Sequence, residues 1–164
     1  MEPLTLTSRP LTTDDDWALA ARWKRDRDYA SIVAGIGSWS EPEIHALYQE
    51  RWGEGEAAYQ LKRLRDDAGD GELRGWFEGE ELVAFLTLRE TNLLADEGPR
   101  LLVVSNLYIL RPEAAAVVAA DLASLADERG IEETDLTIPS HCLPEFQTAG
   151  FAPELVTVRR RWRA

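Results

Sequence analysis

The 164-residue chain has few of the residues that build covalent crosslinks and metal sites. Its single cysteine, Cys142, excludes an internal disulfide and any cysteine-rich zinc site. Only two histidines are present, His45 and His141, so a histidine-based metal site is not expected and no metal is assigned. A chain of this length buries enough surface to fold without such crosslinks. We therefore expect an apolar core to hold the fold together.

Basic residues are also scarce, because 18 lysines and arginines stand against 30 acidic residues and give a formal net charge of −12. This balance argues against a nucleic-acid partner, whose phosphates are neutralised largely by Lys and Arg. No apolar run approaches the ~18 residues of a membrane span, and the start of the chain does not resemble a signal peptide. We expect an acidic, cytoplasmic single domain over residues 1–164 without a membrane partner. The sequence leaves its oligomeric state open.

The N-terminal part predicts a short strand followed by helices. Residues 4–7 alternate apolar and polar side chains and predict a strand that ends before Pro10. Thr12 or Thr13 can cap a helix whose first turn holds three aspartates. Residues 28–40 are expected to be irregular because two glycines interrupt them. Two more helices are expected, at residues 40–52 and 57–65.

The pattern then changes its period. Residues 73–90 predict two strands around a tight turn at Gly79, and a polar loop over 91–99 follows. Residues 101–110 form a nearly continuous apolar run, which predicts a central strand. An amphipathic helix follows Pro112 and ends at Gly130. The remaining expected elements are a strand over 133–139, a short helix over 143–150 and a strand over 154–162.

Three segments together carry a family resemblance. GWFEGEELVAFLTLRE is a strand–turn–strand, and VVSNLYIL precedes an alanine-rich helix that ends in ERG. LTIPSHCLPEFQTAGF is a strand followed by a short helix and Gly150-Phe151. This order resembles the GNAT superfamily of acyl-CoA-dependent N-acyltransferases. The resemblance implies an α/β (α+β) fold, a mixed and mostly antiparallel twisted sheet flanked by helices.

The resemblance also implies a cofactor, acetyl-CoA or another acyl-CoA. In this family main-chain groups of the central strand hold the pantetheine, here Ser105–Ile109, and amides at the next helix start hold the pyrophosphate. The cofactor-binding residues implied in this way are Leu107, Ile109, Arg111, Ala114, Ala115 and Ala116. The chain departs from the family pattern where a glycine-containing loop is usual. Pro112 lacks an amide proton there, and Glu113 would repel a pyrophosphate, for which Arg111 compensates only in part.

Amine acylation needs donors for the carbonyl, a base or proton relay, and an acid for the thiolate. His141 is the best candidate base, because imidazole titrates near neutral pH; the alternative is a structural residue at a helix start. Cys142 is either a nucleophile or a buried structural thiol. Ser105 and Asn106 either orient the substrate or satisfy a bulge in the strand. Tyr108 either supplies the acid that protonates the thiolate or packs in the core.

The missing acid is inferred from the resemblance, because Phe146 stands where many family members have a tyrosine that protonates the thiolate. On the acceptor side, negative charge would favour a small cationic amine, as in GNAT enzymes that modify aminoglycosides. The acidic residues considered there are Glu41, Glu43, Glu50, Glu54, Glu56, Asp96 and Glu97. Trp39, Tyr48 and Trp52 either wall a substrate site or belong to the core.

Two functions of different classes follow from the sequence. The first is an N-acyltransferase that transfers an acetyl or acyl group from acyl-CoA to a small cationic amine. The second is a GNAT-fold protein that has lost acyl-CoA binding. Such a protein would serve as a ligand-binding module or catalyse a different reaction in the same cleft, such as a lyase or decarboxylase step.

Overall fold

The structure is a computed structural model that describes residues 4–35, 42–43, 46, 50, 53–94 and 97–154. These residues form two compact units. The first joins the N-terminal residues up to Thr12 with Arg65–Pro153, and the second contains the helical residues Thr13–Leu64. The organisation as a single domain stays a prediction. Two expected elements lie mostly outside the described residues: the helix over 40–52 and the strand over 154–162.

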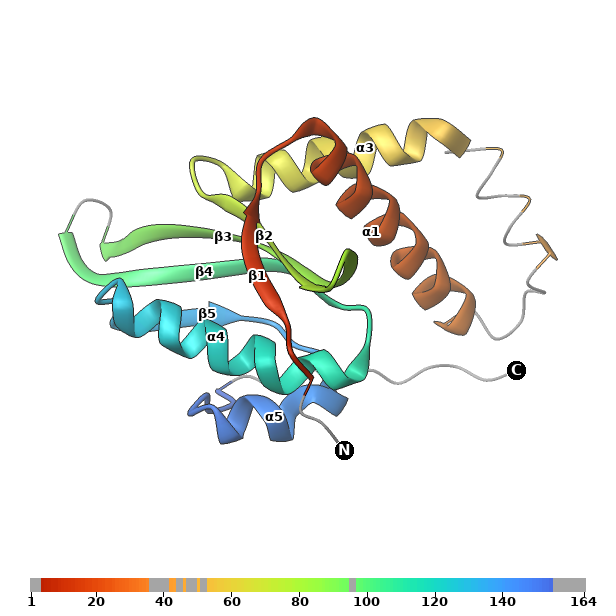
Figure 1. Ribbon diagram of the computed structural model, residues 1–164. Coiled ribbons are helices and arrows are strands. Elements are labelled where there is room, and N and C mark those ends of the chain that lie inside the picture. The colour runs from red at the N-terminus through yellow and green to blue at the C-terminus, as the bar shows by residue number, and fades with distance from the viewer. Residues whose placement is uncertain are drawn as a thin grey trace. The chain divides into compact units, whose positions relative to one another are not determined.

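The first unit is built on a sheet with the strand order β1-β2-β3-β4-β5 (Figure 1). All neighbouring strands are antiparallel except β4 and β5, which are parallel. This confirms the expected mixed, mostly antiparallel sheet. The strands are β1 (Thr7–Leu11), β2 (Glu72–Glu78), β3 (Glu81–Leu94), β4 (Glu97–Ile109) and β5 (Glu133–Leu136).

The β2–β3 hairpin turns where the sequence predicts, with Glu78 opposite Glu81 and Gly79 at a φ of 59°. β3 is buried on both faces from Leu82 to Leu88, and it holds the central place among the described strands. β4, which contains residues 101–109, also has a paired strand on each side, as expected of a strand inside the sheet. β4 lies beside β3, and its later residues are only half-buried.

Three predicted boundaries are clearly wrong, and the strand expected over 133–139 also ends early, at Leu136. The first strand begins at Thr7 and continues through Pro10, because β1 is an edge strand and tolerates a residue without an amide proton. The polar segment over 91–99 is mostly strand, since β3 and β4 stay paired out to Leu94 and Glu97. The third error concerns residues 28–35, which are helical and belong to α1 (Asp14–Gly35). That segment has no residue that breaks a helix before Gly35.

The second unit contains α1 and most of α3 (Gly53–Ala68). Thr13 caps α1 as expected, because its Oγ1 accepts the Asp16 amide at 3.1 Å. Inside α1, Lys24 is buried and its Nζ lies 2.7 Å from an Asp28 carboxylate oxygen one turn later. The glycine at position 53 is helical and belongs to α3.

One face of the sheet is covered by α4 (Ala115–Glu128), with α5 (Leu143–Thr148) beside it (Figure 1). The buried face of α4 follows helical spacing, and Gly130, at a φ of 64°, closes the helix just after its C-cap Arg129, as predicted. The core beneath it includes the fully buried Trp76, whose indole N–H donates to Asp121 of α4 at 2.7 Å. The buried residues of α4 are Ala115, Val118, Ala119, Leu122 and Ala126.

Candidate functional site at the end of strand β4

Strand β4 contains a bulge near its end. Thr87 of β3 pairs with Ser105, whereas Phe85, two residues earlier, pairs with Tyr108, three residues later. β4 therefore has one extra residue over this stretch, which increases twist and redirects the strand. Asn106 lies inside the bulge at a φ of 51°, a left-handed conformation that asparagine tolerates better than most residues.

Side-chain hydrogen bonds hold the bulge in place. The fully buried Thr87 donates its hydroxyl proton to the Ser105 carbonyl at 2.9 Å. The Asn106 side-chain amide donates to the Thr87 hydroxyl at 3.2 Å and to the Asp67 carboxylate at 2.7 Å. Of the two roles considered for Asn106, these bonds support the one in which it satisfies the bulge. Thr87 and Asp67 were not singled out from the sequence, because neither belongs to a local motif.

Just before the bulge, β4 leaves its neighbour β5. The parallel ladder joins Leu101–Val104 to Glu133–Leu136, while β4 itself continues to Ile109. Parallel strands leave a ladder at the same end, so Ser105–Ile109 and the segment after β5 lie at one end of the sheet. That segment leads through residues 137–139 into η2 (Ser140–Cys142), which holds His141.

The side chains of the β4 end mostly pack inward. Leu107 and Ile109 are half-buried and contact the core cluster. The Tyr108 ring stacks on Phe85, with centroids 5.0 Å apart and planes 13° from parallel. This stacking fixes the plane of the Tyr108 ring. The main chain of this segment is thus held on a rigid, apolar base.

The residues around η2 separate into exposed and buried ones. His141 is exposed, whereas Cys142 and Phe146 are fully buried beneath α4. Burial, with a smaller contribution from Glu145, raises the pKa of the Cys142 thiol. A nucleophilic cysteine needs the opposite shift, so these observations support the structural thiol. Phe146 packs against Phe151 at 5.4 Å between ring centroids and is a core residue.

The start of α4 is a tight turn whose amides are largely engaged. η1 (Pro112–Ala114) precedes the helix, and Pro112 has no amide proton. The Ala114 amide donates to the Arg111 carbonyl at 2.9 Å, and the Ala115 amide donates to the Pro112 carbonyl. The Arg111 amide donates to the Val83 carbonyl at 3.3 Å. Ala114 and Ala115 are also buried, while Ala116 is exposed.

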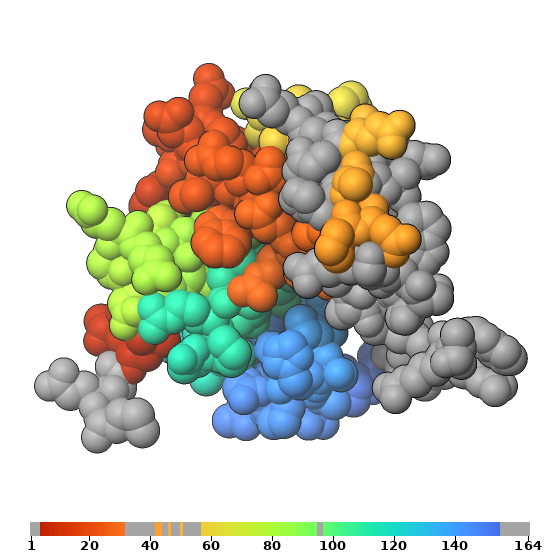
Figure 2. Space-filling model, turned by 90° about the vertical axis from the view of Figure 1, so that its right-hand side faces the viewer, coloured from red at the N-terminus to blue at the C-terminus, as the bar shows by residue number. Residues whose placement is uncertain are grey.

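The Arg111 side chain is bound to the β2–β3 turn. Its guanidinium pairs with the carboxylate of Glu78 and lies 3.5 Å from that of Glu81. The hydrogen bond to Glu78 raises the pKa of Arg111 above its usual value, and the carboxylates of Glu81 and Glu113 act in the same direction. We call Arg111, Glu78 and Glu81 the hairpin clamp. Figure 2 shows the lime-green turn beside the teal start of α4, with the blue η2–α5 segment next to it.

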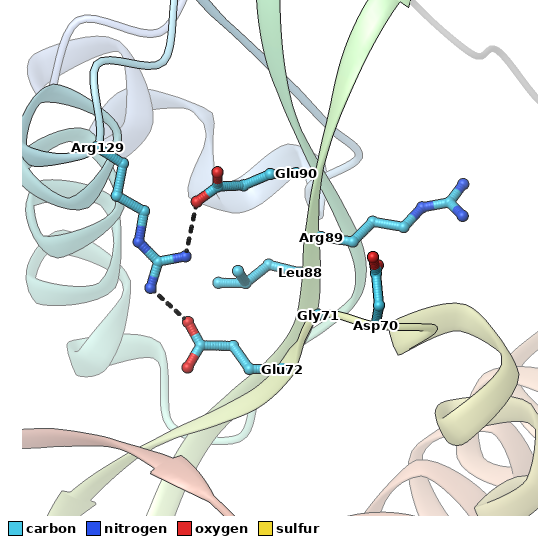
Figure 3. Close-up of a pocket in the computed structure, with 7 residues that line it drawn as sticks. All are labelled: Asp70, Gly71, Glu72, Leu88, Arg89, Glu90 and Arg129. Atoms are coloured by element: carbon cyan, nitrogen blue, oxygen red, sulfur yellow. Dashed lines mark hydrogen bonds and ion pairs between the residues drawn. The ribbon is translucent and has the colours of Figure 1, made fainter. Parts of the chain in front are cut away.

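A separate pocket of about 370 Å³ lies at the other end of α4 (Figure 3). Arg129 bridges two strands there, with nitrogens 2.7 Å from Glu72 and 3.2 Å from Glu90. Figure 3 shows Asp70 and Arg89 pointing away from these three side chains. Arg74 also pairs with Glu72 and Arg100 with Glu90, so several ion pairs tie this helix end to the sheet. No local motif indicates this bridge, because Glu90 and Glu72 lie 39 and 57 residues before Arg129 in the sequence.

Comparison with solved structures decides the fold. The chain is similar to a GCN5-related N-acetyltransferase from Ralstonia eutropha, with 18% identity, a TM-score of 0.54, and coverage of 95% of this chain and 98% of that chain. It is similar to a predicted acetyltransferase with acetyl-CoA from Clostridium acetobutylicum, with 17% identity, a TM-score of 0.54, and coverage of 94% and 96%. This chain has the GNAT fold.

The GNAT fold does not by itself fix an activity. A transcriptional regulator from Bacillus halodurans is also similar, with 17% identity, a TM-score of 0.57, and coverage of 96% of this chain and 100% of that chain. No protein-family model and no curated protein sequence matches the chain.

The residues present fit only one part of an acyl-CoA. The bulged β4 segment, which leaves the β5 ladder, fits the place of the pantetheine in a GNAT fold. The start of α4 does not fit the pyrophosphate, because the amides of Ala114 and Ala115 are engaged and Pro112 lacks one. Arg111, expected to compensate, is held by the hairpin clamp, and Glu113 adds a carboxylate to the first turn.

Several predicted residues cannot be placed against this site. Trp39, Tyr48 and Trp52 lie outside the described residues. Among the acidic residues predicted for the acceptor side, Glu43, Glu50 and Glu97 are described and are exposed.

Across the described part of the chain, no cluster of three or more His, Cys, Asp or Glu side chains could bind a metal ion. Among the described residues, no helix is long and apolar enough to cross a membrane.

Proposed function

We propose that this protein is an N-acyltransferase that moves an acyl group from an acyl thioester, such as acetyl-CoA, to a small cationic amine. The observation that carries the proposal is the bulged end of β4 at Asn106, where the strand leaves its neighbour β5 in a GNAT fold. The similarity to acetyltransferases, one of them with acetyl-CoA, supports the same reaction class.

The reaction requires few groups from the protein. The amine nitrogen attacks the thioester carbonyl carbon, the carbon–sulfur bond breaks, and the nitrogen loses a proton while the thiolate gains one. We assign His141 as the base or proton relay, because it is exposed at the same end of the sheet as Ser105–Ile109. Ser105 and Asn106 act as positioning residues, since their hydrogen bonds with Thr87 fix the course of β4. Tyr108, or a water molecule, protonates the thiolate.

The acceptor class is inferred from charge. The chain carries a formal net charge of −12, and Glu43, Glu50 and Glu97, three of the acidic residues considered for the acceptor side, are exposed. A negative surface raises the local concentration of cations and lowers that of anions. We therefore expect primary amines with a second positive charge, and we retain Trp39, Tyr48 and Trp52 as predicted walls of the acceptor site.

The first test is calorimetric titration with acetyl-CoA, followed by measurement of thiol release with a polyamine, an aminoglycoside and an anionic amino acid. We expect acetyl-CoA to bind and thiol release to occur with the cationic amines. His141→Ala should lower turnover by about 10²–10⁴ with little change in unfolding free energy. The matched control is Gln147→Ala, an exposed substitution on α5 that should alter neither quantity. Unchanged turnover in His141→Ala would remove the catalytic assignment.

A second candidate function is favoured by the start of α4, where the engaged amides and the hairpin clamp oppose pyrophosphate binding. It is a GNAT-fold module that binds a small cationic ligand, or converts it by a different reaction, without an acyl donor. Binding of a cationic amine combined with no binding of any acyl thioester would support this second function and exclude the first.

A further inference from the structure

The start of α4 differs from the rest of the site in its charge and in its hydrogen bonding. The following inference rests on the proposed acyl transfer. We propose that the protein recognises its acyl donor through the thioester and the pantetheine arm alone. The hairpin clamp together with Glu113 then keeps the nucleotide pyrophosphate away from the helix start. The donor class is thus acyl-pantetheine thioesters irrespective of the nucleotide.

The backbone supports this inference. A helix start binds phosphate only when its first amides are free to donate. Here the Arg111 amide donates to Val83, and the amides of Ala114 and Ala115 donate within the turn. Pro112 has no amide to donate. Four of the five positions from 111 to 115 therefore offer no ready donor to a phosphate oxygen.

The side chains point to the same conclusion. Glu78, Glu81 and Glu113 place three carboxylates around the single guanidinium of Arg111, which leaves a formal charge of −2. To bind a phosphate, Arg111 would have to exchange the Glu78 carboxylate for it. Glu113 would remain in the first turn and repel the new anion. Recognition through the nucleotide is thus unfavourable both in hydrogen bonding and in charge.

By contrast, the pantetheine side of the site is rigid. The bulge is held by bonds from the buried Thr87 and from Asn106, and Tyr108 stacks on Phe85. An extended amide-containing arm can pair with main-chain groups of a strand whose neighbour has ended. The amides of pantetheine suit such pairing, so affinity should reside in this arm.

The experiment compares the calorimetric Kd of acetyl-CoA with that of S-acetylpantetheine, which lacks the nucleotide and its pyrophosphate. We expect the two constants to agree within about 3-fold at low salt, and added salt to improve acetyl-CoA binding by screening the carboxylates. Acetyl-CoA binding more than about 30-fold tighter than S-acetylpantetheine would overturn this inference and leave the acyltransferase proposal intact. If neither compound binds, the proposed function itself is refuted, and this inference with it.

A single substitution tests the electrostatic part. Glu113→Gln should tighten acetyl-CoA binding about 2- to 5-fold, which corresponds to one exposed charge near a helix start, and should leave S-acetylpantetheine binding unchanged. Glu128→Gln, at the opposite end of α4, is the matched control and should change neither constant. An equal gain for both ligands, or no gain for acetyl-CoA, would contradict repulsion of the pyrophosphate. The readout is affinity, so it does not depend on turnover.

Discussion

The hydroxyl of Thr87 supports the bulge on which the proposed site depends, so Thr87→Val is the most informative change to stability. The substitution keeps the shape of the side chain but removes one donated and one accepted hydrogen bond, to Ser105 and from Asn106. At roughly 1 kcal/mol for each bond, the loss in unfolding free energy is about 2 kcal/mol. For a chain of this length, that lowers Tm by about 4–8 °C.

Urea denaturation of the variant and the parent protein measures the loss directly. Thr91→Val is the control, because Thr91 lies on the same strand but is exposed, and its cost should stay below about 0.5 kcal/mol. A loss in Thr87→Val no larger than that of the control would refute the role given to the hydroxyl.

A double-mutant cycle separates the two bonds. Asn106→Gly suits the left-handed φ of 51° and removes the side-chain amide that donates to Thr87. In that background Thr87→Val loses only its bond to the Ser105 carbonyl. The double variant should therefore be about 1 kcal/mol more stable than the sum of the single losses predicts. Additivity within about 0.3 kcal/mol would show that the two side chains do not interact.

Three further outcomes are expected elsewhere in the fold. Gly71→Ala should cost about 3 kcal/mol in urea denaturation, because a Cβ there would lie 1.9 Å from the Leu88 carbonyl oxygen. Gly69→Ala, where no atom lies within 4 Å of a Cβ, should cost only about 1 kcal/mol for its positive φ. Burial raises the pKa of Cys142, so the folded state disfavours the thiolate, and stability should fall as pH rises above the unfolded thiol pKa of about 8.5. Cys142→Ala should abolish that fall, and a parent stability that does not change above this pH would contradict the shift. Phe146→Tyr should lower stability by about 1–3 kcal/mol, because its hydroxyl enters a fully buried site, and a gain in turnover would show instead that this position lies at the reacting thioester.

Much of the fold could be predicted from the sequence because neighbouring residues set where these elements begin and end. The cap at Thr13, the turn at Gly79 and the stop at Gly130 are set by neighbouring residues, and all three are where the sequence predicts them. The spacing of apolar residues in α4 likewise predicts its buried face. The order of these elements was enough to indicate the GNAT fold. The predicted boundaries were wrong where pairing with another strand extended an element, as at Pro10 and Leu94.

The candidate site depended on contacts between distant parts of the chain. Asn106 was noticed as a polar residue in an apolar run, but its partners Asp67 and Thr87 lie 39 and 19 residues away. Nothing local to Arg111 indicates that its guanidinium pairs with Glu78, 33 residues earlier. Strand register and helix packing decide such pairs.

The sequence by itself thus determined the elements, their order and the chemical types at the end of β4. Only the tertiary structure decided which of those groups are engaged. It buries Cys142 and Phe146 and leaves His141 exposed. It also engages the amides of Ala114 and Ala115 in hydrogen bonds within the turn. The physical reason is that a propensity acts over a few residues, whereas burial and hydrogen-bond satisfaction are fixed when separate elements pack together.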